Sequence, residues 1–214
     1  AEFLIENFPV DGHVAFNQAE TPPTEDERII NLSVQDNEFE HPDLPILKEP
    51  GIFDLTNEDV FGPAGEVVTA NLASEVIAGG VFNNLVGFYT VTNEAGGIDT
   101  DDDGIADLNP GEDGYTQAAL ANAEDAILKR GQTGSIELTS GEIVVPFLLV
   151  QGGDLNEIPA ELPEGVQAYF PYLAANADGA DHFRLLSDNT LGIEDLKGGG
   201  DQDFNDLIFQ LDFA

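Results

Sequence analysis

The sequence predicts a mainly β fold: a calcium-bound β-sandwich with one substantial helix. From Gly51 onward, short runs of apolar and β-branched residues recur between clusters of Gly, Pro, Asn and Asp, which is typical of strands joined by turns. Hydrophobic residues make up 42% of the 214 residues, so the chain can bury a sizeable core. The sequence contains no Cys, and bound cations are the natural substitute for disulfides in stabilising such a fold.

The predicted elements divide the chain into two parts. Residues 1–49 are expected to form a lead-in segment with one or two strands, near residues 3–5 and 29–34, around an acidic, Pro-containing stretch. Residues 51–214 are expected to form one domain. Its predicted strands are 66–72, 81–92, 135–138, 142–150, 166–173, 182–186 and 204–213.

Residues 115–130 break the strand pattern and predict the one substantial helix. The segment is rich in Ala, Asp113 stands where an N-cap residue would, and Lys129, Arg130 and Gly131 resemble a helix C-terminus. Its small residues are expected to pack closely on a sheet.

The segment 99–107 reads Asp-Thr-Asp-Asp-Asp-Gly-Ile-Ala-Asp and predicts a calcium loop. Ca²⁺ takes about 6–8 oxygen ligands, which one short segment can supply when alternate carboxylates and a backbone carbonyl converge. Gly104 allows the tight turn, and the Ile105 side chain is expected to anchor the loop in the core. The predicted ligands are the carboxylates of Asp99, Asp101, Asp103 and Asp107 and the carbonyl of Ile105.

This loop differs from an EF-hand, because Pro110 occupies the twelfth position where a bidentate Glu is required. It resembles more closely the Asp-x-Asp-x-Asp-Gly-x-x-Asp loop of type-3 thrombospondin repeats, in which the ion holds a loop rather than a helix pair. The alternative is a solvated acidic loop without an ion.

A second predicted metal site lies in the segment 188–206. Three consecutive glycines, Gly198 to Gly200, allow a sharp turn that could bring the carboxylates on either side together. Carboxylates beside a buried strand need a partner. The alternative is a flexible glycine loop with surface acids. The candidate ligands are Asp188, Asn189, Glu194, Asp195, Asp201, Asp203 and Asp206.

The net charge limits the classes of partner. The chain has 42 Asp and Glu against six Lys and Arg, a formal charge of −36, so a compact fold would repel itself without bound cations. We therefore expect two or more Ca²⁺ ions. Binding to nucleic acid or insertion into a membrane is not expected, since both nucleic acid and anionic lipid are recognised through Lys and Arg clusters.

The C-terminal motif also carries a family resemblance. The sequence Gly-Gly-Gly-Asp-Gln-Asp-Phe-Asn-Asp at 198–206, together with Leu-Val-Gly-Phe-Tyr at 85–89 and the segment 176–186, resembles a bacterial domain family of long-unassigned function. Its members occur in large secreted proteins, often near repeat-in-toxin calcium-binding repeats. The resemblance covers about residues 51–214. It implies a secreted or cell-surface calcium-bound β-sandwich, such as the ligand-binding end of a repeat-in-toxin adhesin.

These observations predict a binding module rather than an enzyme. No nucleophile elbow, zinc-protease motif or phosphate loop occurs in the sequence. The expected function is calcium-dependent adhesion, with an extracellular peptide or carbohydrate captured at a partly open Ca²⁺ site and neighbouring domains of the same long chain as further partners. The alternatives are a calcium-stiffened spacer and a secreted hydrolase or its accessory domain.

Three other sets of residues leave alternatives open. Tyr169, Phe170 and Tyr172 could form a platform for sugar rings, although alternating aromatics in a strand more commonly belong to the core. Arg184 could bind a ligand carboxylate or form a structural pair with a nearby acid. The scattered His13, His41 and His182 could contribute to a transition-metal site of two histidines and a carboxylate, although His182, beside Asp181, is more simply a strand-end residue.

Overall fold

The computed structural model describes residues 3–7, 15–18, 51–187 and 189–213. The chain divides into two compact units, Ala1–Pro42 and Asp43–Ala214. The sequence places this boundary a few residues later, between residues 49 and 51.

In the first unit, β1 (Phe3–Asn7) and β2 (Ala15–Gln18) form a two-stranded antiparallel sheet. The predicted strand at residues 3–5 lies within β1, whereas β2 has no counterpart among the predicted strands. The predicted strand at residues 29–34 lies outside the described residues.

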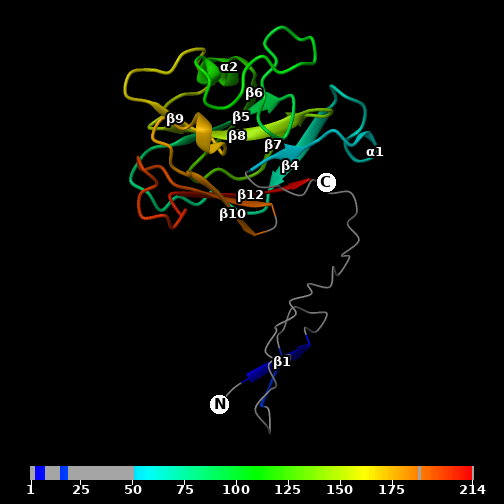
Figure 1. Cartoon of the computed structure of the whole chain (residues 1–214), viewed down its shortest axis with the longest axis vertical. Helices are drawn as coiled ribbons and strands as arrows, with labels where there is room; N and C mark the ends of the chain where they lie inside the picture. The colour runs from blue at the N-terminus through cyan, green and yellow to red at the C-terminus, as the bar shows by residue number, and fades with distance from the viewer. Residues whose placement is uncertain (1–2, 8–14, 19–50, 188, 214) are drawn as a thin grey trace. The chain divides into compact units, whose positions relative to one another are not determined.

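The second unit is built from two antiparallel sheets, seen as two layers in Figure 1, and confirms the predicted mainly β fold class. The first sheet has the strand order β10 (Phe183–Ser187), β11 (Thr190–Ile193), β12 (Leu207–Phe213), β4 (Val67–Leu72) and β7 (Ser135–Thr139). The second has the order β3 (Phe53–Asp54), β8 (Ile143–Val150), β5 (Leu85–Val91) and β6 (Ala123–Lys129), with β9 (Gln167–Tyr169) also paired to β8.

The main core lies between the two sheets. On the first sheet, β12 alternates buried and more exposed residues, so that Leu207, Phe209 and Leu211 all face inward. Phe209 meets Phe88 of the opposite sheet with ring centroids 6.2 Å apart in an edge-to-face arrangement. Such side chains from both sheets form one continuous cluster, which makes the unit a β-sandwich.

The second sheet is buried on both faces. The side chains of Tyr89 and Phe147 point away from the sandwich interior and belong to a separate apolar cluster. This cluster is covered by α2 (Tyr115–Ala121), where the hydroxyl groups of Tyr89 and Tyr115 lie 3.0 Å apart. Two-sided burial explains why β8 reads as an almost unbroken apolar run instead of alternating.

The predicted helix over residues 115–130 is wrong in its second half. The helix α2 begins at Tyr115 but ends at Ala121, and residues 123–129 form β6 against β5. The predicted cap is also wrong, because the N-cap residue is Gly114, with φ 93° and no side-chain hydrogen bond. The edge of β5 offers backbone hydrogen bonds, and burial of Ala126 and Leu128 in the main core outweighs the helical propensity of the segment.

The remaining helical segments are short: α1 (Glu58–Phe61) and the 3₁₀ turn η2 (Leu173–Ala175). The predicted strand at 166–173 shortens to β9 before η2 begins. Besides β6, the strands β3 and β11 of this unit were not predicted. The strand β11 matters for the candidate metal centres because Glu194 and Asp195 follow it directly.

Candidate metal centres

The acidic loop 99–107 is closed at its neck by an isolated β-bridge. Ile98 is fully buried, and its N–H donates to the carbonyl of Leu108 at 2.8 Å. The N–H of Asp107 donates back to the carbonyl of Ile98 at 2.8 Å. The loop also contacts the end of α2, since Asn122 Nδ2 donates to the carbonyl of Asp99 at 3.2 Å. Both ends of the loop are therefore fixed by the fold.

Asp99 organises the interior of this loop. Its Oδ1 accepts hydrogen bonds from the N–H groups of Asp101 (3.0 Å) and Asp102 (2.8 Å), and its Oδ2 accepts from Gly104 at 2.6 Å. Gly104 has φ 84°, in the left-handed region that glycine enters without a steric penalty. The predicted role of this glycine in the turn is confirmed.

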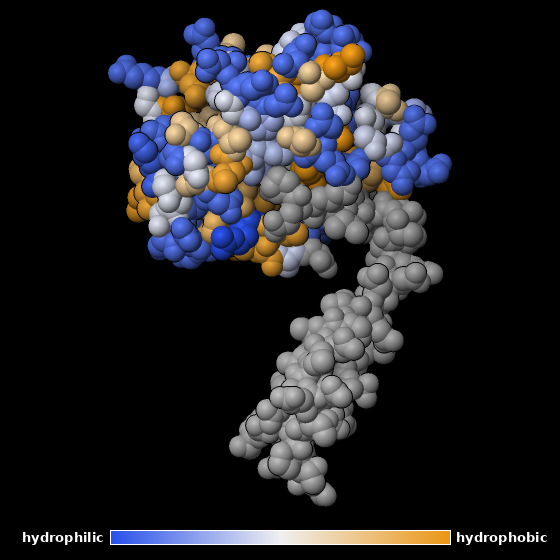
Figure 2. Space-filling model, viewed as in Figure 1, coloured by the Kyte–Doolittle hydropathy of each residue, from blue (hydrophilic) through white to orange (hydrophobic). Residues whose placement is uncertain are grey.

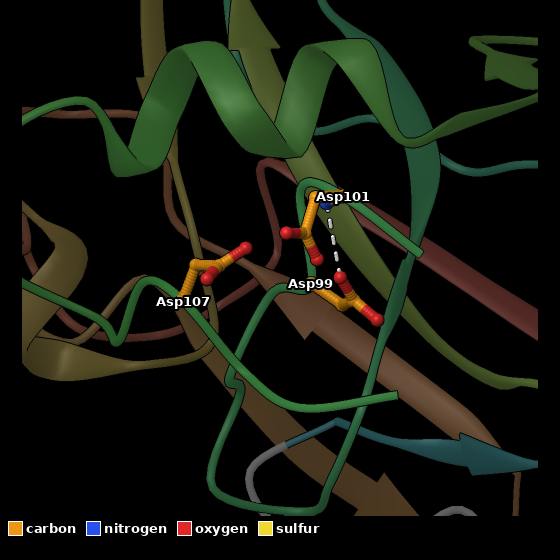
Figure 3. Close-up of side chains that lie close together, drawn as sticks. All are labelled: Asp99, Asp101 and Asp107. Atoms are coloured by element: carbon orange, nitrogen blue, oxygen red, sulfur yellow. Dashed lines mark hydrogen bonds between the residues drawn. The ribbon is translucent and has the colours of Figure 1, made fainter. Parts of the chain in front are cut away.

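Three of the predicted carboxylates converge in the loop, as Figure 3 shows for Asp99, Asp101 and Asp107. One oxygen from each lies within 4.8 Å of the others. Asp103 does not join them, and its Oδ1 accepts from the N–H of Ile105 at 2.8 Å. The predicted anchoring of Ile105 in the core is wrong, because its side chain is 68% exposed. The bridge at Ile98 anchors the loop instead.

Hydrogen bonds lower the pKa of two of the three carboxylates. Desolvation tends to raise the pKa of Asp99, but the hydrogen bonds from Gly104 and its neighbours outweigh it and lower the pKa below its usual value. The pKa of Asp107 is also lowered, because its Oδ2 accepts from the hydroxyl (2.6 Å) and N–H (2.9 Å) of Thr100. Ionised carboxylates are the form that binds a hard cation.

Asp101→Asn should weaken calcium binding at this loop by about tenfold or more, because affinity in such loops depends on the number of charged ligands. The matched control is Asp102→Asn, which removes the same charge from the same loop but at a residue outside the converging group. Asn also tolerates the positive φ of 62° at position 102.

Calorimetric titration of each variant with calcium measures the affinity site by site. Equal weakening by Asp101→Asn and Asp102→Asn would show that only the net charge of the loop matters and would contradict a specific site.

The second candidate centre lies where β11 ends and β12 begins. The strand β11 places Glu194 and Asp195 directly after Ile193, and the loop 196–206 returns the chain to β12. The N–H of Glu194 donates to the carbonyl of His182 at 2.9 Å, and the N–H of Asp195 donates to Asp206 Oδ2 at 2.9 Å. The bond from Asp195 to Asp206 joins the two ends of the loop, and the bond from Glu194 to His182 joins the start of the loop to the residue before β10.

Glu194 is the most unusual side chain of this centre. It is fully buried, and neither carboxylate oxygen has a hydrogen-bond partner among the described residues. Desolvation, followed by the nearby carboxylates of Asp206 and Asp201, raises the pKa of Glu194 to about 7. A buried carboxylate without a partner is costly, so its position requires a compensating group.

Asp195 is nearly as buried, at 3% exposure, but has a partner. Asn84 Nδ2 donates to its Oδ2 at 2.6 Å. Desolvation raises the pKa of Asp195 to about 6, an effect that the hydrogen bond from Asn84 opposes and the charge of Asp206 reinforces.

Two overlapping groups of carboxylates form around Glu194. Glu194, Asp195 and Asp206 make one group, in which Glu194 and Asp195 are buried and Asp206 is half-buried. Glu194 also groups with Asp201 and Asp203, which are exposed. In each group, one oxygen from every residue lies within 4.8 Å of the others, so either group could hold a metal ion.

Two glycines allow the backbone to approach these carboxylates. A Cβ atom at Gly200 would lie 2.0 Å from Glu194 Oε1, and the φ of 45° there also favours glycine. A Cβ atom at Gly80, in the connection from β4 to β5, would lie 2.7 Å from Asp206 Oδ1 and 2.9 Å from Asp195 Oδ2. The centre is thus enclosed by backbone from two distant segments.

Other predicted ligands do not meet at this centre. Asn189 precedes β11, at the end of the strand opposite to Glu194, and its carbonyl accepts from the N–H of Leu211 at 3.2 Å. Asp188 lies outside the described residues. Asn84 and Gly80, by contrast, were not predicted, because they lie more than 100 residues from Asp195 in the sequence and belong to no motif.

His182 contacts the backbone of the centre at Glu194. Its ring is fully buried, with Nδ1 2.7 Å from the carbonyl of Glu194 and Nε2 3.1 Å from Asp178 Oδ2. It stacks on Tyr169, with ring centroids 3.5 Å apart. Asp178 also accepts from the N–H of Gly198 at 2.8 Å. These contacts hold the loop 196–206, called the glycine loop below, against β9 and β10, so His182 has a larger structural role than a strand-end residue.

The aromatic and cationic candidates have structural positions. Tyr169, Phe170 and Tyr172 are all buried, which favours the core interpretation over a sugar platform. Arg184 lies 3.9 Å from a carboxylate oxygen of Asp181, and its guanidinium group stands 3.8 Å from the centroid of the Phe204 ring.

On the face of the second unit visible in Figure 2, polar and apolar residues are interspersed. Among the described residues, no helix is long and apolar enough to cross a membrane.

Comparison with known protein families finds one match. Residues 138–214 match the model of a domain of unknown function (DUF4114). This segment includes the loop 196–206, Glu194 and the four aspartates around it. It is shorter than the expected resemblance over 51–214 and leaves out the loop 99–107. No curated protein and no solved structure matches the chain significantly. Part of the chain is therefore similar to an uncharacterised domain family.

Proposed function

We propose that the second unit is a calcium-dependent binding module of an exported protein, which captures an extracellular peptide or carbohydrate through a partly open Ca²⁺ site. The observation that carries this proposal is the asymmetry of one carboxylate group. Glu194 is fully buried, whereas Asp201 and Asp203 are exposed. A cation bound there would be held by the protein on one side and would face solvent on the other.

The chemistry of the group favours calcium. Carboxylate oxygens are the ligands of hard cations, and the described groups contain neither Cys nor His. Three carboxylates supply fewer ligands than the 6–8 oxygens that Ca²⁺ usually takes. Backbone carbonyls and water fill the remaining positions, and water at an exposed position can be displaced by a carboxylate or by vicinal hydroxyl groups of a ligand.

The acidic surface explains why the contact would run through the metal. With a net charge of −36, the chain repels an anionic ligand at long range unless a bound cation reverses the charge locally. A peptide carboxylate or a neutral sugar can then bind at the cation. The same charge is the reason to propose an environment rich in calcium, such as the cell exterior.

The main alternative is a spacer that calcium stiffens without binding a ligand. It is favoured by the inner group, in which Asp195 and Asp206 are held by hydrogen bonds within the fold. A spacer needs only such closed sites. The exposed Asp201 and Asp203, by contrast, leave one side of a bound cation open to solvent, which a spacer does not require, and this difference makes the two functions distinguishable.

A peptide and glycan array tests the proposal. With calcium, the full chain should bind at least one class of ligand, and a chelator should abolish that binding reversibly. The double variant Asp201→Asn/Asp203→Asn should lose the binding while keeping its fold. The matched control Asp101→Asn, which affects the separate loop 99–107, should retain it.

Two results would contradict the proposal. The absence of any binding on a broad array with calcium present would favour the spacer. Binding that survives in the Asp201→Asn/Asp203→Asn variant would place the ligand away from the exposed carboxylates and overturn the proposed site.

A further inference from the structure

The buried carboxylate of Glu194 has two oxygens, and both need a compensating group. Both of its oxygens are buried, and both lack a hydrogen-bond partner among the described residues. Within the described residues, no Lys or Arg forms an ion pair with Glu194 or with the four aspartates around it; the ion pairs present there join His182 to Asp178 and Arg184 to Asp181. An ionised Glu194 therefore needs a compensating charge from outside the chain.

Glu194 lies next to two different sets of carboxylates. The inner set contains Asp195 and Asp206, and the outer set contains Asp201 and Asp203. Glu194 is the one residue that both sets share. An ionised carboxylate has two oxygens and about four lone-pair sites, so it can serve two cations at once.

We infer that this centre holds two divalent cations bridged by the Glu194 carboxylate. The inner cation is bound by Glu194, Asp195 and Asp206, and the outer cation by Glu194, Asp201 and Asp203. The inference rests on the proposed calcium dependence of the module but is separate from ligand capture, since a bridged pair could equally stiffen a spacer.

The charge balance supports two ions rather than one. The five residues of the two groups carry −5 when all are ionised, and two divalent cations carry +4. A single cation would leave −3 on a centre that contains two buried carboxylates, Glu194 and Asp195. Like charges so close to each other and so poorly solvated repel strongly, and a second cation removes most of this repulsion.

The fold gives the two sites different access. The inner site is bounded by the backbone at Gly80, where a Cβ atom would come within 3 Å of both Asp206 and Asp195. The outer site has two exposed ligands in the glycine loop. The inner ion is therefore enclosed by the fold, and the outer ion is the one that can exchange water for an external ligand.

Counting bound calcium in substituted full-length chains tests the bridge. Equilibrium dialysis or native mass spectrometry should show that Glu194→Gln binds two fewer calcium ions than the unmodified chain. Asp201→Asn/Asp203→Asn should bind one fewer, because it keeps the inner ligands. The matched control Asp212→Asn, which removes one charge from an exposed residue of β12, should bind the same number.

A melting experiment at pH 8 distinguishes a loss of calcium ligands in Glu194→Gln from misfolding of this variant. In chelator, Glu194→Gln should melt at a higher temperature than the unmodified chain, because a neutral amide replaces an unpaired buried carboxylate. In millimolar calcium the order should reverse. A loss of one ion or none in Glu194→Gln would overturn the bridge, and so would unchanged binding in Asp201→Asn/Asp203→Asn. The ligand array result affects neither measurement.

Discussion

Removing calcium should lower the melting temperature of the second unit by about 10 °C or more. A ligand that binds only the folded state adds RT ln(1 + [L]/Kd) to the free energy of unfolding, about 4 kcal/mol at a thousandfold excess over Kd. For a chain of this size, 1 kcal/mol shifts the melting temperature by roughly 2–4 °C. Several ions bound to one fold would add their effects.

The physical reason is the repulsion that calcium removes. Glu194 and Asp195 are buried next to Asp206, so without a cation their charges repel one another. Among the described residues, the hydrogen bonds from Asn84 to Asp195 and from the Asp195 N–H to Asp206 offset this repulsion in part. The measurement is a thermal melt followed by circular dichroism in calcium, in chelator, and in chelator with calcium restored. An unchanged melting curve in chelator would contradict a structural role for calcium.

Phe204→Ala should lower the free energy of unfolding by about 3–5 kcal/mol, the usual cost of removing a buried Phe. Phe204 is 1% exposed and belongs to neither apolar cluster of the sandwich. Its ring is covered by Arg184, and its carbonyl passes so close to Gly192 that a Cβ atom there would lie 2.4 Å away. It therefore fixes the loop between Asp203 and Asp206 onto the β10 and β11 hairpin.

The same substitution should weaken calcium at the Glu194 centre by about 10–100-fold, the usual effect of losing a residue that orients metal ligands. Phe204 has φ 55°, a conformation that costs roughly 1–2 kcal/mol for a residue other than glycine and needs support from its surroundings. Without the packing of the ring, the strained backbone conformation at this position loses its support, and the loop can relax.

Phe209→Ala is the matched control for this prediction. Phe209 lies in the main core, where it contacts Phe88, and its loss should cost a similar free energy of unfolding. Calorimetry with calcium, at a temperature where both variants are folded, should show weakened binding only for Phe204→Ala. Equal calcium affinity in the two variants would mean that Phe204 serves packing alone.

The sequence by itself determined the fold class and the two acidic regions. Short apolar runs between turn residues are a local signal, and each of the seven strands predicted within residues 51–214 overlaps an observed one. The loop 99–107 was predictable for the same reason, because Asp99, Asp101 and Asp107 lie within nine residues and their convergence depends mostly on the turn at Gly104.

Within that loop, the sequence could not separate equivalent carboxylates. Asp101 and Asp103 occupy equivalent positions in the alternating pattern of acids. The Asp103 carboxylate nevertheless accepts a hydrogen bond from the N–H of Ile105, whereas the Asp101 carboxylate belongs to the converging group. Which oxygen meets which donor depends on the final backbone angles, which a residue pattern does not specify.

The tertiary structure decided the arrangement of everything that depends on distant segments. Residues 123–129 became β6 because β5 offered a sheet edge, against a sequence that favours helix. Glu194 became a buried, unpartnered carboxylate because the glycine loop closes over it, and Asp195 was paired with Asn84, 111 residues away in the sequence. Burial and long-range pairing are properties of the assembled sheets, so no local pattern could have predicted that one glutamate would face two sets of aspartates.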